Sequence, residues 1–262
     1  MQRITLILLS IYIILSAYTL LLSGLGQPPI EVLTPALSLI AFVFAVLHAC
    51  RRIGWRRAVL LLALTFGVSL LFESVGVATG LVYGPYHYTA KLGYKFLGLV
   101  PLLIPAAWFM MMYPAYVMAC RLVPSVWKTW RWRLGVAVLG GFAMTAWDLA
   151  MDPLMVAGGH WVWDIKGAYF GVPLQNYWGW WLTTFITFAS FAWLANTSPQ
   201  EPHAYDHQAV SSYAVTGLTT ILYNMSIGLG GPGLVGLFAM LPWVLGTWLL
   251  TPGKIPPATS LY

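Results

Sequence analysis

The chain has 262 residues, of which 60% are apolar and only 8% are charged, and its mean hydropathy is +0.77. A soluble domain carries about 25% charged residues, so this composition excludes a water-soluble globular protein and predicts an all-α integral membrane protein. The net charge of +6 comes from basic residues in short clusters between apolar runs. Such clusters indicate membrane topology and do not predict nucleic-acid binding.

Apolar runs divide the chain into about eight predicted membrane-spanning helices, because a spanning helix needs roughly 20 apolar residues. The runs are 4–24, 33–50, 57–76, 98–120, 134–152, 177–196, 209–228 and 232–250. The first run follows Arg3 and is longer than the roughly 7–15 residues of a signal-peptide core, so we expect a retained helix. The links are short, which predicts a single membrane domain over 1–262 with a frayed Pro-rich tail after Pro252.

Basic residues predict the orientation of these helices. In the eight-span arrangement one side of the membrane holds Arg3, Arg51, Arg52, Arg56, Arg57, Arg121, Lys128, Arg131, Arg133 and Lys254. The opposite loops, 77–97 and 153–176, hold only Lys91, Lys95 and Lys166. The positive-inside rule therefore places both termini in the cytoplasm and these two loops outside.

Acidic residues fall at a common predicted depth. Glu73 follows Arg57 by 16 residues and Asp148 follows Arg133 by 15, so at 1.5 Å per residue both lie about 22–24 Å above the cytoplasmic collar. Asn224, deep in the seventh run, is expected to reach a similar level. Three polar side chains at one depth predict a site toward the outer leaflet.

Asp148 and Asp152 are four residues apart and therefore share one helix face. Two carboxyl groups so close disfavour double ionisation, so one is expected to hold a proton beside an ionised partner. Ionisable groups inside a membrane are costly and usually functional. The alternative is structural: Asp152 caps a turn before Pro153, Asp148 pairs with a tryptophan N–H, and Glu73 is a helix-end carboxylate in contact with water.

Two segments of the chain resemble each other. One runs from Glu73 to His87 and the other from Asp148 to His160, and each then passes a Gly/Tyr/Phe segment to Val-Pro-Leu and an aromatic-rich helix. This pattern indicates a possible tandem repeat of one hairpin, spans three–four and five–six, related by an axis along the membrane normal. The two outer loops would then lie over one pocket.

Histidines and aromatic residues surround the predicted site. His87 and His160 are expected either to anchor the loops at the interface or to bond to the site, whereas Asp164 and Lys166 are expected to form a solvated pair. A set of aromatic residues is expected either to form the usual aromatic belt at the membrane interface or to line a pocket for an extended apolar ligand. The set comprises Trp161, Trp163, Tyr177, Trp178, Trp180 and Trp181.

Several chemistries have no support in the sequence. A membrane prenyl transferase needs two Asp-rich motifs to hold Mg²⁺ against diphosphate, and "DLAMD" supplies one. The motifs GxSxG and HExxH and a His-rich di-iron set are absent from the sequence. We therefore expect no metal and no cofactor, which leaves proton chemistry on an apolar substrate.

Four segments carry long, mixed patterns: "GLVYGPYHYTAKLGYKFLGLVPLLIPAAWFMMMYPAY", "DLAMDPLM", "GHWVWD" and "GAYFGVPLQNYWGWW". They resemble the integral-membrane carotenoid 1,2-hydratases, which include bisanhydrobacterioruberin hydratases and γ-carotene 1′-hydroxylases, and the likeness covers about residues 65–196. The resemblance implies an enzyme of carotenoid biosynthesis, a lyase that adds water across the terminal 1,2 double bond of an acyclic ψ end group. It assigns no catalytic residue.

The chemistry itself suggests roles. Protonation of the alkene at C2 leaves a tertiary cation at C1, which water attacks; the donor must be a neutral acid, and aromatic faces can stabilise the cation. We predict Asp148 as the acid and Glu73 or Asp152 as the base that holds the water. The predicted substrate contacts are His87, His160, Asn224 and Tyr83 as polar partners and Trp147, Trp178 and Trp181 as the cation-facing wall.

The expected partners are a membrane-dissolved carotenoid, water and the lipid bilayer, with no nucleic acid; other carotenoid-pathway enzymes could join them. Two other functions fit the same acids. A proton-coupled transporter or carrier of a lipid-like solute would use Glu73 and Asp148 as coupling sites. A cofactor-free terpenoid cyclase or isomerase would use them while excluding water.

Overall fold

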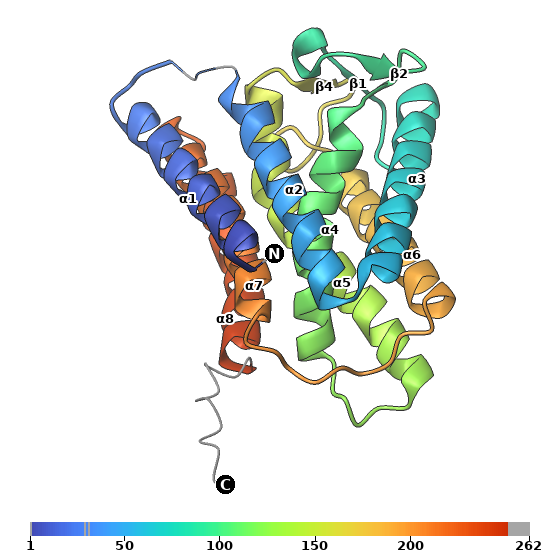
Figure 1. Cartoon of the computed structure of the whole chain (residues 1–262). Coiled ribbons are helices and arrows are strands. Elements are labelled where there is room, and N and C mark those ends of the chain that lie inside the picture. The colour runs from blue at the N-terminus through green and yellow to red at the C-terminus, as the bar shows by residue number, and fades with distance from the viewer. Residues whose placement is uncertain (1, 29, 31, 251–262) are drawn as a thin grey trace, which may run out of the picture.

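The computed structural model of the chain describes residues 2–28, 30 and 32–250 and contains eight long helices in this part (Figure 1). The helices are α1 (Gln2–Gly24), α2 (Leu33–Arg52), α3 (Trp55–Thr79), α4 (Leu103–Leu122), α5 (Thr129–Ala157), α6 (Leu174–Leu194), α7 (Asp206–Ser226) and α8 (Gly230–Leu250). Four short strands and a 3-10 turn accompany them: β1 (Tyr86–Tyr88), η1 (Ala90–Leu92), β2 (Lys95–Phe96), β3 (Val100–Pro101) and β4 (Trp161–Trp163). The predicted tail after Pro252 and the predicted position of Lys254 lie outside the described residues.

The all-α prediction is confirmed, with adjustments at two helix boundaries. Within the described residues, six helices (α1 to α5 and α8) are long and apolar enough to cross a membrane, and α6 and α7 pack beside them with more Thr, Ser and aromatic residues. The fourth helix begins at Leu103, not at 98, because Lys95–Phe96 and Val100–Pro101 form a hairpin. The fifth continues through Pro153 to Ala157, so Asp152 lies inside a helix and does not cap its end.

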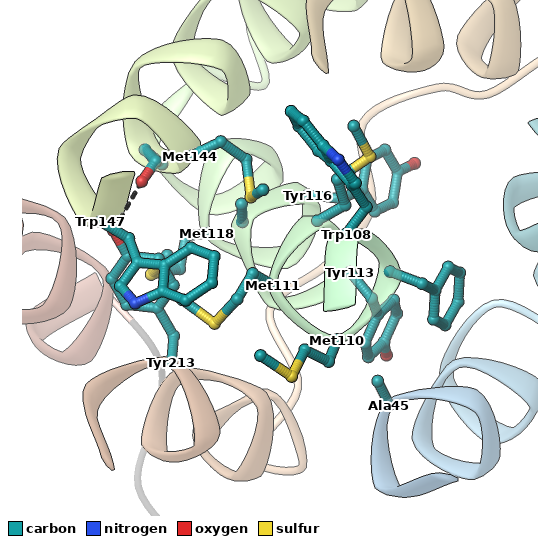
Figure 2. Close-up of a cluster of buried hydrophobic side chains, with 14 of the residues drawn as sticks. Ala45, Trp108, Met110, Met111, Tyr113, Tyr116, Met118, Met144, Trp147 and Tyr213 are labelled. Carbon is teal, nitrogen blue, oxygen red and sulfur yellow. Dashed lines mark hydrogen bonds between the residues drawn. The ribbon is translucent and has the colours of Figure 1, made fainter. Parts of the chain in front are cut away.

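Helix α4 lies in the middle of the bundle, and most of its residues are buried. Figure 2 shows Met111 and Tyr113 projecting from α4 on different sides toward the surrounding helices. The interior there is packed with aromatic and methionine side chains that fill irregular gaps between helices. A buried, rigid α4 therefore gives the neighbouring α3, α5 and α6 a fixed support.

Helices α1 and α7 run parallel and side by side, although about 200 residues separate them. Near their beginnings Thr5 Oγ1 is 2.9 Å from the hydroxyl of Tyr205, and near their ends Ser23 Oγ is 2.6 Å from Ser226 Oγ. The pairing at both ends fixes the register of the two helices over their whole length.

A buried ion cluster fastens the arginine-rich end of the bundle. The carboxylate of Asp206, at the start of α7, lies 2.5 Å from Arg52 Nε and 2.9 Å from Arg121 Nε. Because the side chains come from α2, α4 and α7, the cluster joins three helices. Removing the acid alone would leave two guanidinium groups without a counter-charge, which is costlier than lacking the whole cluster.

We therefore expect Asp206→Asn to lower the free energy of unfolding by about 3–5 kcal/mol. The measurement is thermal or denaturant unfolding of purified protein in detergent. The exposed Glu201 provides a matched control, since Glu201→Gln also replaces a carboxylate with an amide, but at a position where water solvates the side chain. Equal stability of the two variants would contradict the role of the cluster.

At the opposite end, β1 and β4 pair antiparallel and cap the bundle (Figure 1). Tyr86 lies opposite Trp163 and Tyr88 opposite Trp161, with His87 facing Val162 at the centre. An antiparallel pair of this kind has a local two-fold axis through its middle, so the hairpins α3–β1–α4 and α5–β4–α6 meet in a symmetric way. The symmetry fits a repeat but corrects its register, because the counterpart of His87 is Val162 and not His160.

Candidate active site

A cavity of about 570 Å³ lies beneath the β1–β4 cap and is lined by residues of α1 to α7. This volume is within the range of small-molecule sites in proteins, roughly 300–1,000 Å³. Much of its wall is apolar, including Leu37, Ile104 and Met110, and two carboxyl groups, Glu73 and Asp152, also face it. The cavity therefore combines an oily interior with acid–base groups.

Glu73 is buried near the end of α3 and accepts three hydrogen bonds. The hydroxyls of Tyr86 and Tyr88 both donate to Oε2, the second at 2.9 Å, and Trp108 Nε1 donates to Oε1 at 2.9 Å. Burial and the adjacent Glu73 raise the pKa of both tyrosines well above the ordinary value. The tyrosines thus keep their protons and act as donors to the carboxylate.

Asp152 in α5 has an equivalent set of donors. Trp161 Nε1 and Trp163 Nε1 donate to Oδ1 at 2.9 and 3.2 Å, and Asn176 Nδ2 donates to Oδ2 at 2.7 Å. Three N–H donors around a buried carboxyl group favour its ionised form. Asp152 is therefore held in place from two sides, with one edge left toward the cavity.

The two carboxyl groups follow one construction plan. Each receives two donors from alternate residues of the short strand that follows its helix, and a third from the next helix. Alternate residues of a strand point to the same side, so the Tyr-x-Tyr of β1 and the Trp-x-Trp of β4 both aim their donors inward. The equivalence of Glu73 and Asp152 again corrects the sequence comparison, which paired Glu73 with Asp148.

Asp148 lies one helical turn from Asp152 but is not on the cavity wall. It is completely buried; its Oδ2 accepts a 2.7 Å bond from Asn176 Nδ2, and its Oδ1 has no partner among the described residues. An ionised group with a bare buried oxygen is strongly unfavourable, whereas a protonated carboxyl group is much less so. The side-chain nitrogen of Asn176 therefore bridges two carboxyl groups: that of Asp152, which faces the cavity, and that of Asp148, which does not.

An aromatic wall connects the carboxyl groups to the rest of the cavity. Trp108, which bonds to Glu73, stacks on Trp180 with ring centroids 3.9 Å apart, and Trp147 meets Trp180 edge-on at 5.9 Å. All three rings line the cavity. Trp147 was among the residues predicted for this wall, and Trp180 was expected either in the interfacial belt or in the pocket lining, whereas Trp108 was not predicted to belong to the site.

The structure does not place Trp178 and Trp181 in this wall. Trp178 is 57% exposed and stacks on Trp181, whose Nε1 donates to the carbonyl oxygen of Val138 at 3.3 Å. On α6 the cavity-facing residues are instead Asn176 and Trp180, four positions apart. Because Trp178 and Trp181 occupy a different side of the same helix, they cannot face a cation in the cavity.

His160 and Tyr83, two of the predicted substrate contacts, both line the cavity. Burial lowers the pKa of His160, and nearby Lys91 lowers it further, so the imidazole is neutral at pH 7. The ring of Tyr83 is inserted between α3 and α6, where a Cβ on Gly76 or Gly179 would approach it to 2.8 or 2.4 Å. These two glycines are therefore needed for Tyr83 to reach the cavity.

His87 and Asn224 lie away from the cavity. The middle residue of β1, His87, points outward and its Nδ1 is 2.8 Å from Asp164 Oδ1 on the surface. Asn224 is buried behind the wall and donates to the carbonyl oxygen of Ala150 at 2.8 Å. Side chains alternate along a strand, so His87 points outward because its neighbours Tyr86 and Tyr88 point inward.

Chemically, the site offers anionic or proton-sharing carboxyl groups, aromatic faces and an apolar chamber. In the described part of the chain, no three His, Cys, Asp or Glu side chains are grouped so that they could hold a metal ion. The groups on the wall can donate a proton to a bound apolar molecule, receive one from water, and stabilise positive charge between them.

Comparisons with known proteins identify similar sequences. A family model described as "Carotenoid biosynthesis protein" matches residues 33–242. A bisanhydrobacterioruberin hydratase from Haloarcula japonica is 35% identical over 147 residues, which cover 56% of this chain and 46% of that protein. The chain thus matches about half the length of this curated relative. No solved structure matches the chain.

Proposed function

Because this chain belongs to the carotenoid biosynthesis protein family, we propose that it is a carotenoid hydratase. The substrate would be a membrane-dissolved acyclic carotenoid, and water would add across the terminal 1,2 double bond of its ψ end group. The observation that carries this proposal is the pair of donor-held carboxyl groups, Glu73 and Asp152, on the wall of a largely apolar cavity. The hydratase from Haloarcula japonica is similar in sequence and supports the same assignment.

In the proposed reaction Asp148 and Asp152 share one proton. Asp152 is the member at the cavity wall, so it delivers the proton to C2 of the alkene, and the carbon–carbon π electrons form the new C–H bond. Asp152 thereby returns to the ionised form that its three N–H donors favour. Asp148, bridged to it through Asn176, is the buried member that keeps the pair singly protonated. This arrangement revises the prediction that Asp148 itself contacts the substrate.

Protonation leaves a tertiary cation at C1, and the aromatic wall of Trp108, Trp147 and Trp180 faces the cavity in which it forms. Aromatic faces stabilise cations by about 0.5–2 kcal/mol each, more when water is excluded. Glu73 then accepts a proton from the water that attacks C1. Glu73 then releases that proton and the aspartate pair regains one, so the net change is the addition of one water molecule.

Expression in a bacterium that accumulates an acyclic carotenoid tests the proposed activity. We expect a more polar pigment, heavier than the precursor by one water molecule, as judged by chromatography and mass spectrometry. Unchanged pigment in membranes that contain the folded protein would contradict hydration, and an isomer of unchanged mass would favour a double-bond isomerase or a cyclase.

Asp148→Asn is expected to lower hydration by roughly 10²-fold or more, because the shared proton can no longer be stored beside Asp152. The amide oxygen can still accept the bond from Asn176, so insertion and folding should survive. Asp164→Asn is the matched control, since Asp164 bonds to His87 on the surface and its loss should be nearly silent. Normal hydrated product per unit of inserted Asp148→Asn protein would remove this residue from the mechanism.

We also propose that both termini are cytoplasmic and that the site lies toward the outer leaflet, as the basic clusters predict. Lys91 and Lys166 lie in the exposed loops at the β1–β4 end of the bundle. Membrane-impermeant thiol reagents should therefore label Lys91→Cys and Lys166→Cys from outside intact cells. Labelling from the cytoplasmic side alone would reverse the orientation.

A further inference from the structure

The cavity has a second polar surface, which the mechanism above does not use. It consists of hydroxyl side chains on α1 and α7, called here the hydroxyl face: Tyr12, Ser16, Thr19, Thr216, Thr220 and Tyr223. On each helix these residues follow a spacing of four and then three positions, which aligns them along one side. Since α1 and α7 run parallel in register, the two rows lie beside each other along the cavity.

Three of these six hydroxyls, those of Thr19, Thr216 and Thr220, donate their proton to a carbonyl oxygen of their own helix and can still accept hydrogen bonds. Thr216 Oγ1 donates to the carbonyl oxygen of Ser212 at 2.8 Å and receives the hydroxyl of Tyr12 at 2.8 Å. Thr220 Oγ1 donates to the carbonyl oxygen of Thr216 at 2.9 Å. A hydroxyl oxygen has two acceptor positions, so each of these oxygens can accept one further hydrogen bond from the cavity.

Ser16 gives the clearest sign that the hydroxyl face binds a ligand. Ser16 is only 2% exposed and lines the cavity, and its Oγ lies near the Tyr12 hydroxyl without a well-formed hydrogen bond to the described residues. Leaving a buried hydroxyl without a partner costs roughly 1–3 kcal/mol. A molecule in the cavity that can both donate and accept hydrogen bonds would remove this penalty, and water does both.

The position of the hydroxyl face fits a path for water. Its outer end reaches the exposed pair Ser23–Ser226, and its inner end closes at the bond between Tyr12 and Thr216. Midway, Trp147 Nε1 donates to Thr220 Oγ1 at 3.3 Å, which joins the hydroxyl face to the aromatic wall. The apolar surface of the cavity includes Leu37 and Ile104, and two further hydroxyl side chains, Thr34 and Ser38 of α2, also line the cavity.

We propose that the hydroxyl face binds a file of water molecules and supplies the water that captures the cation, while the polyene lies against the apolar surface. The inference rests on the proposed hydratase function. The inference gives α1 and α7 a role in determining whether the cation becomes an alcohol or an alkene. A cation that meets no water returns a proton to a carboxylate and becomes an alkene again.

This competition provides the test. Purified protein in liposomes is given an acyclic carotenoid in deuterated water, and two products are measured: hydrated carotenoid, and recovered alkene that has gained deuterium. For Ser16→Ala, Thr220→Val and the double variant we expect the ratio of hydration to exchange to fall by roughly three- to tenfold per hydroxyl, the effect of one lost hydrogen bond. The matched control is Thr187→Val, a buried threonine of α6 that bonds only within its helix and lies off the cavity.

The outcomes separate this inference from the hydratase proposal. If the wild-type protein makes no hydrated product, the proposed function itself fails. If the wild type hydrates and all variants keep its ratio, the hydroxyl face does not supply the water, even where total turnover drops. A change confined to KM for carotenoids that already carry a hydroxyl group would also overturn the proposal, since it would show that the face binds the substrate's alcohol.

Discussion

Asp152→Asn is expected to lower hydration by roughly 10²–10⁴-fold, the usual effect of losing a general acid. The asparagine side chain fits the same space, and its amide oxygen can still accept from Trp161 and Trp163. What disappears is the transferable proton at the cavity wall. The protonation step itself should therefore fail, so both hydrated product and deuterium exchange into the recovered alkene should drop together.

The measurement for Asp152→Asn is initial product formation per unit of membrane-inserted protein, with exchange followed in deuterated water. Wild-type exchange in a variant that no longer hydrates would show that another group protonates the alkene. Near-normal hydration would exclude Asp152 as the donor altogether.

Glu73→Gln is expected to give a loss of similar size, roughly 10²-fold or more, with a different pattern. The glutamine oxygen can still accept from the tyrosine hydroxyls or Trp108, but it cannot take a proton from water. The Asp148–Asp152 pair remains intact, so the alkene should still be protonated and exchange deuterium. Hydration should thus fall while exchange persists.

The contrast between the two variants assigns the roles. If Glu73→Gln loses deuterium exchange and Asp152→Asn keeps it, Glu73 is the acid and Asp152 is the base, the reverse of the roles proposed above. If both variants behave alike, the three carboxyl groups act as one proton-sharing unit, and separate roles for the two wall residues are wrong.

Hydropathy could predict much of the fold, because a spanning helix leaves a long apolar run in the sequence. The eight helices agree with eight such runs, and the largest errors are at local features: the β2–β3 hairpin before Leu103 and the continuation of α5 through Pro153. Proline inside a helix is tolerated where neighbouring helices support the backbone, and hydropathy does not record that support.

The sequence could not determine which side of a wholly apolar helix faces the interior. In water, polar residues mark the outer side, but in lipid both sides are apolar. Trp178 and Trp180 therefore look equivalent in the sequence, although only Trp180 lines the cavity. The four-residue spacing of Asp148 and Asp152 likewise predicts a shared face but not which of them reaches the wall.

The donors to the carboxyl groups could have been found from the sequence. Tyr86 and Tyr88 are two residues apart, as are Trp161 and Trp163, and this is the spacing of one strand face. The predicted repeat aligned the histidines His87 and His160 instead. In the structure His87 pairs with Val162, so aligning His87 with His160 placed the repeat two positions out of register.

The most direct test of the account traces the atoms of water. Purified protein in liposomes is incubated anaerobically with an acyclic carotenoid in water labelled with heavy oxygen and deuterium. Addition of water predicts a product with one labelled oxygen in a tertiary hydroxyl at C1 and one deuterium at C2, formed without molecular oxygen. A hydroxyl that carries no label from water, or a product that forms only when molecular oxygen is supplied, would contradict hydration at this site.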